Sequence, residues 1–284
     1  MYAWFGSEGL YTYDLDGKLL WKAELGGIAA MGVGVGTSPV LHGEHVILQC
    51  DEDGGEKSFI AALDRKTGRE AWRVARKVQV SWATPVIVKA GGRDELVTAG
   101  AEAIIAYDPA TGKELWRAKG LESNAVPSPV TGPDVVVLTS GYPSKVAMAI
   151  KPGGSGDVSG SPQILWTYAK GTAYVPSPVA VDGLVYLMTD KGLLTCLDAV
   201  TGEVKYEGGR PPAASSYMAS PVVVGGRILL MSMDGDTHVI KAGPTHEVLR
   251  TNSLGEPIAA SAAVAPGRLY IRGEHHLFAI GSGT

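Results

Sequence analysis

A short motif recurs along the chain and constrains its fold more than any other feature. An apolar or aromatic residue is followed by Asp, by Gly three or four positions after the Asp, and by an aromatic residue four positions after the Gly. Clear copies occupy residues 13–21, 63–72, 107–116 and 197–206, and weaker copies begin at residues 150 and 240. A turn chemistry that repeats at this spacing indicates an array of similar structural units.

A second marker alternates with the first. It is a Ser-Pro or Thr-Pro pair followed by an apolar residue, and successive copies lie 41 to 49 residues apart. The copies begin at Ser38, Thr84, Ser128, Ser177 and Ser220, with a degenerate copy at Ser261. Between the markers lie short apolar runs rich in β-branched residues and bounded by Gly or Asp, such as 45–50, 134–138 and 184–188, which predict strands. Gly and Pro interrupt every window that would suit an amphipathic helix.

One period therefore holds four strands, which predicts an all-β propeller of four-stranded antiparallel blades. Five complete blades are expected from residue 34 to 254, with three strands before them and three after them. We predict a single seven-bladed domain, residues 1–284, whose first blade lacks its inner strand and whose last lacks its outer strand. An alternative is a longer parent with eight blades. The blades are expected at about residues 1–25, 34–76, 77–120, 121–170, 171–210, 211–254 and 255–284.

Each marker has a physical role in this fold. The Asp accepts hydrogen bonds within its own turn, and the Gly supplies a positive φ. The aromatic residue is large enough to pack against the adjacent blade. The Pro is expected within the inner strand, on an edge where no hydrogen-bond donor is needed. The unpaired edges of the incomplete blades also suggest a homodimer.

Composition excludes several classes. The 284 residues carry 25 Lys and Arg against 29 Asp and Glu, a net charge of −4 without long charge runs, so no nucleic-acid partner is expected. No apolar run approaches the roughly 18 residues of a membrane helix, and the first residues do not resemble a signal peptide. Two cysteines cannot form a disulfide framework, and we interpret Cys50 and Cys196 as small buried residues on strands.

At residues 63–72 and 107–116, together with the Ser-Pro-Val segments, the chain resembles the pyrroloquinoline-quinone-like propeller repeat family. That family includes quinoprotein alcohol dehydrogenases, the propeller lipoprotein of the outer-membrane barrel assembly machinery and many uncharacterised bacterial exported propellers. Residues 151–156 and 174–178 are most similar to the last group. The resemblance implies a bacterial protein with a periplasmic or extracellular parent.

The quinoprotein enzymes of this family have a vicinal disulfide, calcium ligands and a catalytic Asp. Here Cys50 and Cys196 are 146 positions apart, and no Asp or Glu adjoins Trp82, the one Trp placed to stack on a flat ring. We therefore expect no cofactor and no catalytic residue. Pyrroloquinoline quinone with calcium is the alternative.

The residues just before each Ser/Thr-Pro pair are expected to surround one mouth of the propeller channel. Aromatic and amide side chains there would stack on and hydrogen-bond a ligand. In the alternative interpretation they plug the channel and pack on each other. Gly34, Gly36, Ser81 and Ser123 also fall at this level, and Arg210 lies on a nearby connection. The candidate ligand-binding residues are Trp82, Asn124, Tyr174, Tyr217, Met218 and Arg210.

Three other features are interpreted without a ligand. The acidic segment 51–56 lacks the spacing of a calcium loop and predicts a solvated hairpin. His275 and His276 are adjacent, so on a strand only one would face a given metal site, and no metal is expected. The glycine-rich segments 32–36 and 153–160 lack the helix or the Gly-Lys-Ser/Thr sequence of nucleotide loops.

These observations favour a non-catalytic scaffold that recognises a protein or glycan partner through the channel mouth and the top-face loops. The alternative is a quinoprotein-like dehydrogenase or another propeller enzyme that acts at Trp82, Asn124, Tyr174 and Tyr217. A third hypothesis is that the chain is a piece of a larger sensor or enzyme.

Overall fold

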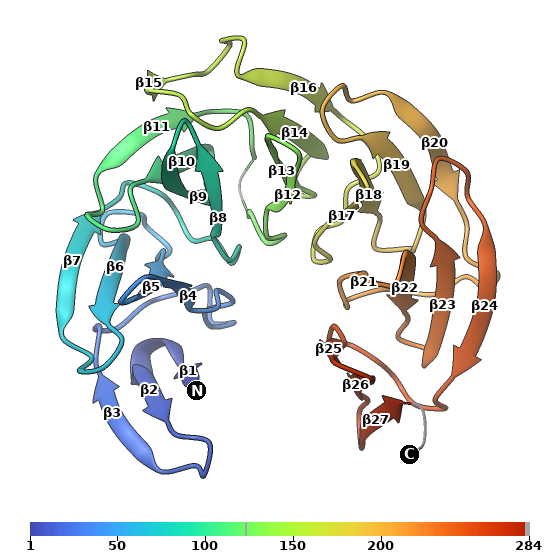
Figure 1. Ribbon diagram of the computed structural model, residues 1–284, viewed down its shortest axis with the longest axis horizontal. Helices are drawn as coiled ribbons and strands as arrows, with labels where there is room; N and C mark the ends of the chain where they lie inside the picture. The colour runs from blue at the N-terminus through green and yellow to red at the C-terminus, as the bar shows by residue number, and fades with distance from the viewer. Residues whose placement is uncertain (123, 282–284) are drawn as a thin grey trace. The chain divides into compact units, whose positions relative to one another are not determined.

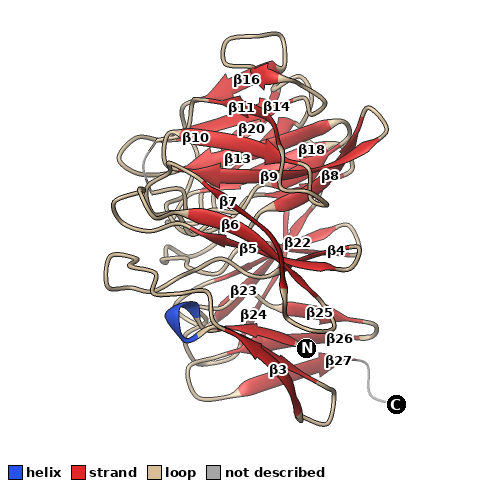
Figure 2. Cartoon of the chain, turned by 90° about the vertical axis from the view of Figure 1, so that its left-hand side faces the viewer, coloured by secondary structure: helices blue, strands red, loops and turns tan. Residues whose placement is uncertain are grey.

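The computed structural model describes residues 1–122 and 124–281. The chain is an all-β propeller with seven blades, and most blades are four-stranded antiparallel sheets, as the repeats predicted (Figure 1). Figure 2 shows strands joined by loops and turns, together with the short 3-10 helix η1 (Gly6–Glu8). None of the helices in the described residues is long and apolar enough to cross a membrane.

The chain divides into two compact units. The first comprises Met1–Pro129 and Ile150–Ile164, and the second comprises Val130–Ala149 and Leu165–Thr284. The blades of the first unit are β1 (Tyr2–Trp4), β2 (Leu10–Tyr13) and β3 (Leu19–Ala23); β4 (Val40–His42), β5 (His45–Cys50), β6 (Phe59–Asp64) and β7 (Glu70–Ala75); and β8 (Val86–Ala90), β9 (Arg93–Gly100), β10 (Ala103–Tyr107) and β11 (Glu114–Ala118).

The remaining blades belong to the second unit, apart from the end residues Ile150 and Ile164. They are β12 (Val130–Gly132), β13 (Val135–Ser140), β14 (Val146–Ile150) and β16 (Ile164–Tyr168); β17 (Val179–Val181), β18 (Leu184–Met188), β19 (Leu194–Asp198) and β20 (Val204–Gly209); β21 (Val222–Val224), β22 (Arg227–Met231), β23 (Asp236–Lys241) and β24 (Val248–Ser253); and β25 (Ala263–Ala265), β26 (Arg268–Arg272) and β27 (Leu277–Gly281).

The two three-stranded blades lack the strands that the sequence predicted them to lack. The Asp turn joins β2 to β3, so these are the third and fourth strands of a blade, and the first is absent from this sheet. The strand β25 follows the degenerate Ser261 marker, so β25 to β27 correspond to the first three strands.

Two predictions about strands are corrected. The Ser/Thr-Pro pairs precede the first strand of each blade instead of lying in it, since β8 begins at Val86, directly after Pro85. The Gly/Ser-rich insertion after β14 also contributes a strand. There, β15 (Gly156–Asp157) pairs in parallel with β11 of the preceding blade (Figure 1). The insertion is long enough to fold back onto the edge of that sheet, whose backbone groups it satisfies.

The turn geometry that recurs between the blades follows from hydrogen bonds to the Asp side chain. In the fifth blade, Asp198 Oδ1 accepts hydrogen bonds from the backbone N–H groups of Val200 (3.0 Å) and Thr201 (2.8 Å). The hydrogen bond from the Thr201 backbone is the main cause of a lowered pKa for Asp198, and partial burial opposes it. The same acceptor role is filled by Asp14, Asp64 and Asp108.

The fourth-strand Trp residues pack on the next blade, as predicted. A Cβ added to Gly202 would lie 2.5 Å from the Trp166 ring, and the Trp166 indole N–H donates to Ala199 O over 3.0 Å. Gly202 has φ +73°, so the position needs Gly for its backbone as well as for space. Equivalent contacts join Trp21 to Gly68 and Trp72 to Gly112.

The Ser/Thr hydroxyls of the second marker also connect successive blades. Four of these hydroxyls accept a hydrogen bond from the backbone N–H of the preceding marker, each over 2.9 Å. In the first unit Ser38 donates to Thr84, and Thr84 donates to Ser128. In the second unit Ser177 donates to Ser220, and Ser220 donates to Ser261.

Candidate functional site

The six candidate residues are divided between the two units. Trp82 and Asn124 belong to the first unit, whereas Tyr174, Arg210, Tyr217 and Met218 belong to the second. Each group is therefore described within its own unit.

Trp82 is packed against a glycine segment of its own unit. Its indole N–H donates to Gly34 O over 2.9 Å, and a Cβ on Gly36 would lie 2.9 Å from the Trp82 Cβ. The Trp82 backbone N–H donates to Ala125 O, which places Trp82 beside the half-buried Asn124. These contacts agree with the packing interpretation of Trp82, while Ser123 lies outside the described residues.

The acidic segment at residues 51–56 is not simply a solvated hairpin, because Asp51 is buried. Its carboxylate lies 3.0 Å from Arg76 Nε, and both side chains are fully excluded from solvent. Ser81 and Gln49 also donate hydrogen bonds to Asp51 Oδ2. An unpaired carboxylate would be costly to bury at this depth, so the network explains why Asp51 is there. The one sequence feature that could have indicated this buried network is Gln49, a polar residue within an apolar run.

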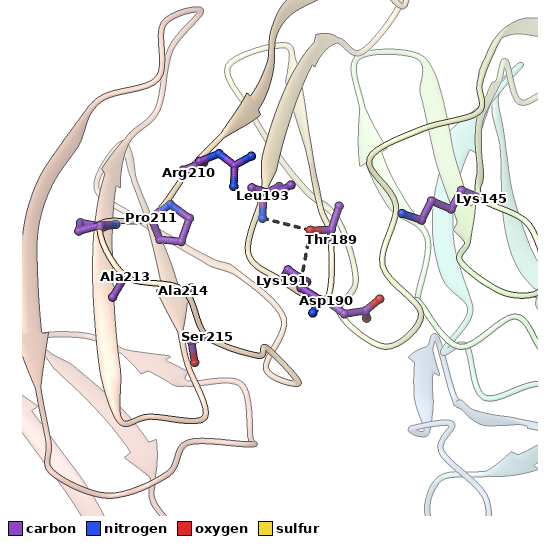
Figure 3. Close-up of a pocket in the computed structure, with 11 residues that line it drawn as sticks. Lys145, Thr189, Asp190, Lys191, Leu193, Arg210, Pro211, Ala213, Ala214 and Ser215 are labelled. Carbon is purple, nitrogen blue, oxygen red and sulfur yellow. Dashed lines mark hydrogen bonds between the residues drawn. The ribbon is translucent and has the colours of Figure 1, made fainter.

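The second unit contains a pocket with a volume of about 560 Å³ (Figure 3). It is formed by the β13–β14 loop, the β18–β19 turn and the connection from β20 to β21. Three cationic side chains, Lys145, Lys191 and Arg210, come from these three segments, and Asp190 supplies a carboxylate. The lining residues are Lys145, Thr189, Asp190, Lys191, Leu193, Arg210, Pro211, Pro212, Ala213, Ala214 and Ser215.

The β18–β19 turn is held by its own hydrogen bonds. Thr189 Oγ1 accepts from the backbone N–H groups of Lys191 (3.3 Å) and Leu193 (3.1 Å), which Figure 3 shows as dashed lines. Gly192 has φ +75°, and a Cβ there would lie 2.3 Å from the Tyr217 ring. The turn therefore packs directly on Tyr217, which fixes the backbone that carries Asp190 and Lys191.

Tyr217 supports the pocket from behind and does not line it. Its side chain belongs to a buried cluster with Leu194, and the residue is 1% exposed. Burial raises the pKa of its hydroxyl to about 12. The Tyr217 backbone N–H donates to Asp190 O over 3.0 Å. The ring therefore lies beneath the surface of this structure, and its role as a binding residue stays a prediction from the sequence.

Tyr174 and Met218 remain accessible. The Tyr174 backbone N–H donates to the Asp190 carboxylate over 2.9 Å, so Tyr174 adjoins the pocket without lining it. Its ring lies 5.6 Å from the ring of Tyr142. The exposed fractions are 38% for Tyr174, 56% for Tyr142 and 48% for Met218. These side chains can contact a partner without a change in the fold.

The backbone at Arg210 is also fixed. His246 Nε2 lies 3.0 Å from Arg210 O, and the ring of His246 packs against Gly209. The next two residues are Pro211 and Pro212, which restrict φ and have no N–H to donate. The structure thus brings together Arg210, Tyr174 and Tyr217 around one turn, and adds Lys145, Asp190 and Lys191, which no sequence motif marked.

Three observations concern the residues that the sequence analysis compared with a quinone and calcium site. Cys50 and Cys196 are free and buried on β5 and β19, as predicted, and burial raises the pKa of Cys196 to about 11. The Trp82 ring already packs on Gly36. Within residues 1–122 and 124–281, no group of three or more His, Cys, Asp or Glu residues is placed to hold a metal ion.

The two histidines also differ from their predicted placement. They lie in the turn before β27 and not on a strand. His276 Nδ1 lies 3.0 Å from Glu256 Oε2, and Glu256 also accepts from the His276 backbone N–H. This arrangement stabilises the turn.

Comparison with known proteins finds a matching family. The family described as "Outer membrane protein assembly factor BamB" matches residues 56–155 and 103–282. An outer membrane protein assembly factor BamB from Nitrosomonas eutropha is 31% identical over 162 residues, which is 55% of this chain and 35% of that protein. The match thus spans about a third of that relative's length.

Solved structures share the fold at lower identity. BamB from Moraxella catarrhalis superposes with a TM-score of 0.71 at 18% identity, over 94% of this chain and 76% of that one. A europium-containing methanol dehydrogenase gives a TM-score of 0.68 at 13% identity, over 95% of this chain and 70% of that one. At these sequence identities, both similarities show a shared fold and nothing further.

Proposed function

Because the chain belongs to the family of the outer membrane protein assembly factor BamB, we propose that it is a non-catalytic, protein-binding scaffold in outer-membrane protein assembly. Its place of action in this proposal is the periplasm. The partner is a protein component of the assembly machinery. Propellers present loops on a rigid β framework, which suits them to this role.

The observation that carries the proposal is the surface beside the pocket in the second unit. Tyr142, Tyr174 and Arg210 are exposed there, and Met218 is an exposed residue that directly follows Tyr217, the residue packed under the β18–β19 turn. Tyr, Met and Arg are enriched in protein interfaces, and Tyr and Arg supply a large share of binding hot spots. The loops that carry them are held by buried contacts, so little ordering is required on binding.

The proposal is tested with purified chain and the purified outer-membrane protein assembly complex of the same organism, depleted of its own propeller factor. Wild-type chain is expected to bind in surface plasmon resonance. The double variant Tyr174→Ala with Met218→Ala should bind about tenfold more weakly, a loss of about 1.4 kcal/mol. The matched control removes two exposed apolar residues elsewhere in the second unit, Val204→Ala with Leu249→Ala, and should bind normally. Absence of wild-type binding, or equal loss in the control, contradicts the proposal.

The enzyme alternative has its own test. A thermal melt of the wild-type chain with pyrroloquinoline quinone and calcium is expected to show no rise in melting temperature. The variant Trp82→Ala should melt at a lower temperature without any ligand, because the ring packs on Gly36. A saturable rise in the wild type that vanishes in the variant would favour a dehydrogenase. A glycan ligand and a homodimer through the edges of the incomplete blades stay predictions from the sequence.

A further inference from the structure

The pocket of the second unit carries uncompensated positive charge. In the part of the chain that the structure describes, none of Lys145, Lys191 and Arg210 forms an ion pair with a carboxylate. All three side chains are exposed. The one carboxylate of the lining, Asp190, accepts backbone hydrogen bonds from Tyr174 and Val175. The lining therefore has three free cations against one carboxylate that is already engaged.

The rest of the lining is apolar and rigid. Leu193, Pro211, Pro212, Ala213 and Ala214 provide most of the other surface. The two prolines cannot donate backbone hydrogen bonds, so the charged side chains and the hydroxyls of Ser215 and Thr189 are the side-chain groups of the lining that can contact polar atoms of a ligand. The volume of about 560 Å³ is in the range of about 300–1,000 Å³ that ligand pockets occupy.

The backbones of two of the three cationic residues, Lys191 and Arg210, are held in place before any ligand arrives. Lys191 lies in the turn closed by Thr189 and supported by the Tyr217 ring. The backbone of Arg210 is held by His246 and by the following prolines. A site that is ordered in advance loses less conformational entropy on binding.

We propose that this pocket binds an extended, acidic segment of a partner protein, whose carboxylates pair with Lys145, Lys191 and Arg210 and whose intervening apolar side chains contact Pro211 and Leu193. The proposal rests on the proposed scaffold function and specifies the chemistry of the partner. Cations on three separate segments match a ligand with several carboxylates along its length, whereas a single inorganic anion has no apolar group to cover the proline and alanine surface. Arg and Lys at such sites recognise carboxylates by charge-assisted hydrogen bonds.

The test uses a fluorescein-labelled peptide of about eight residues in which Glu and Val alternate, long enough to span about 25 Å when extended. A matched peptide with Gln in place of Glu is the ligand control. Fluorescence anisotropy is measured with the full chain at about 50 and 200 mM NaCl, since ionic contacts weaken as salt screens them. The Glu peptide should bind, the Gln peptide should not, and added salt should lower the affinity.

The protein variants separate the pocket from general charge. Lys145→Ala, Lys191→Ala and Arg210→Ala combined should weaken binding of the Glu peptide at least about tenfold, which corresponds to about 1.4 kcal/mol. The control combines Lys18→Ala, Lys57→Ala and Lys113→Ala, three exposed lysines of the first unit, and changes net charge equally. It should bind within about twofold of the wild type. Thermal melts should coincide, because all six side chains are exposed.

Several results would overturn the inference. Equal affinity for the Gln peptide, or equal loss in the control variant, shows that the pocket charges do not select the ligand. Displacement of the peptide by millimolar inorganic phosphate, with the same loss in the pocket variant, identifies a small-anion site instead. Binding to phosphatidylglycerol vesicles but not to the peptide identifies a lipid site. If the Glu peptide does not bind while the assembly complex still binds, this inference fails and the proposed scaffold function stands. If the Glu peptide binds while the assembly complex does not, the scaffold function fails and the pocket still recognises acidic peptides.

Discussion

The backbone N–H of Ser177 donates a 2.9 Å hydrogen bond to the hydroxyl of Ser220, one blade further along the chain. The same bond joins Ser220 to Ser261, where the Pro of the marker has been replaced by Ala262. The hydroxyl is thus the part of the marker that the degenerate copy retains. Its role is to satisfy a backbone donor at the start of the neighbouring blade, which connects successive sheets within the unit.

Removal of this hydroxyl should lower stability. In Ser220→Ala, the partly buried N–H of Ser177 loses this acceptor, which should reduce the free energy of unfolding by about 1 kcal/mol. Ser220→Thr keeps a hydroxyl and should lose less. Urea denaturation followed by tryptophan fluorescence measures both, with the exposed Ser253→Ala as the control. Equal stability of Ser220→Ala and wild type would show that the bond contributes nothing.

The contact between Trp166 and Gly202 can be separated from the backbone preference of that glycine. Gly202 and Gly183 both have positive φ, +73° and +77°, but an added Cβ at Gly183 has no atom within 4 Å. Gly183→Ala should cost about 1–2 kcal/mol for the left-handed backbone alone. Gly202→Ala should reduce the free energy of unfolding by about 1–3 kcal/mol more than Gly183→Ala does, because its methyl group displaces the Trp166 ring. Calorimetric melting of the two variants gives the difference, and similar losses would show that the Trp yields freely.

The buried pair of Asp51 and Arg76 should be sensitive to the loss of one partner. Arg76→Met leaves the Asp51 carboxylate buried without its cation, which should destabilise the fold by about 3–5 kcal/mol. Adding Asp51→Asn removes the uncompensated charge and should restore part of the loss. Denaturant unfolding of both single variants and the double variant completes the cycle. Lys241→Ala, which breaks an exposed pair with Glu247, should cost less than about 1 kcal/mol.

The Asp turns predict a dependence of stability on acid pH. The pKa of Asp198 is lower in the folded protein, chiefly because the Thr201 backbone N–H donates to the ionised carboxylate. Its stabilising contribution is therefore complete above the unfolded pKa of about 4 and is lost as pH falls through the folded pKa. Asp198→Asn should be less stable than wild type at neutral pH, and the two should converge in strong acid. Urea titrations at several pH values measure this, and a gap that stays constant would contradict it.

The sequence was less informative about the candidate site than about the fold. Arg210 lines the pocket and Tyr174 adjoins it, because both lie on connections that precede a Ser-Pro marker. Tyr217 occupies an equivalent position, yet its ring is buried, because Gly192 leaves room for it beneath the turn. Lys145 and Lys191 belong to loops without a recurring pattern. Their proximity to Arg210 depends on how successive sheets pack, and no local sequence pattern predicts that packing.

The sequence by itself determined the blade architecture, because the Asp turn, the positive-φ Gly, the packing Trp and the Ser/Thr hydroxyl act over short, repeated distances. Each such signal is local and is reinforced by every further copy. Only the tertiary structure decided that Asp51 is buried against Arg76 and that three cations converge on one pocket. Those arrangements join residues from different strands and loops, so they depend on long-range packing, which places side chains together without any regular spacing along the chain.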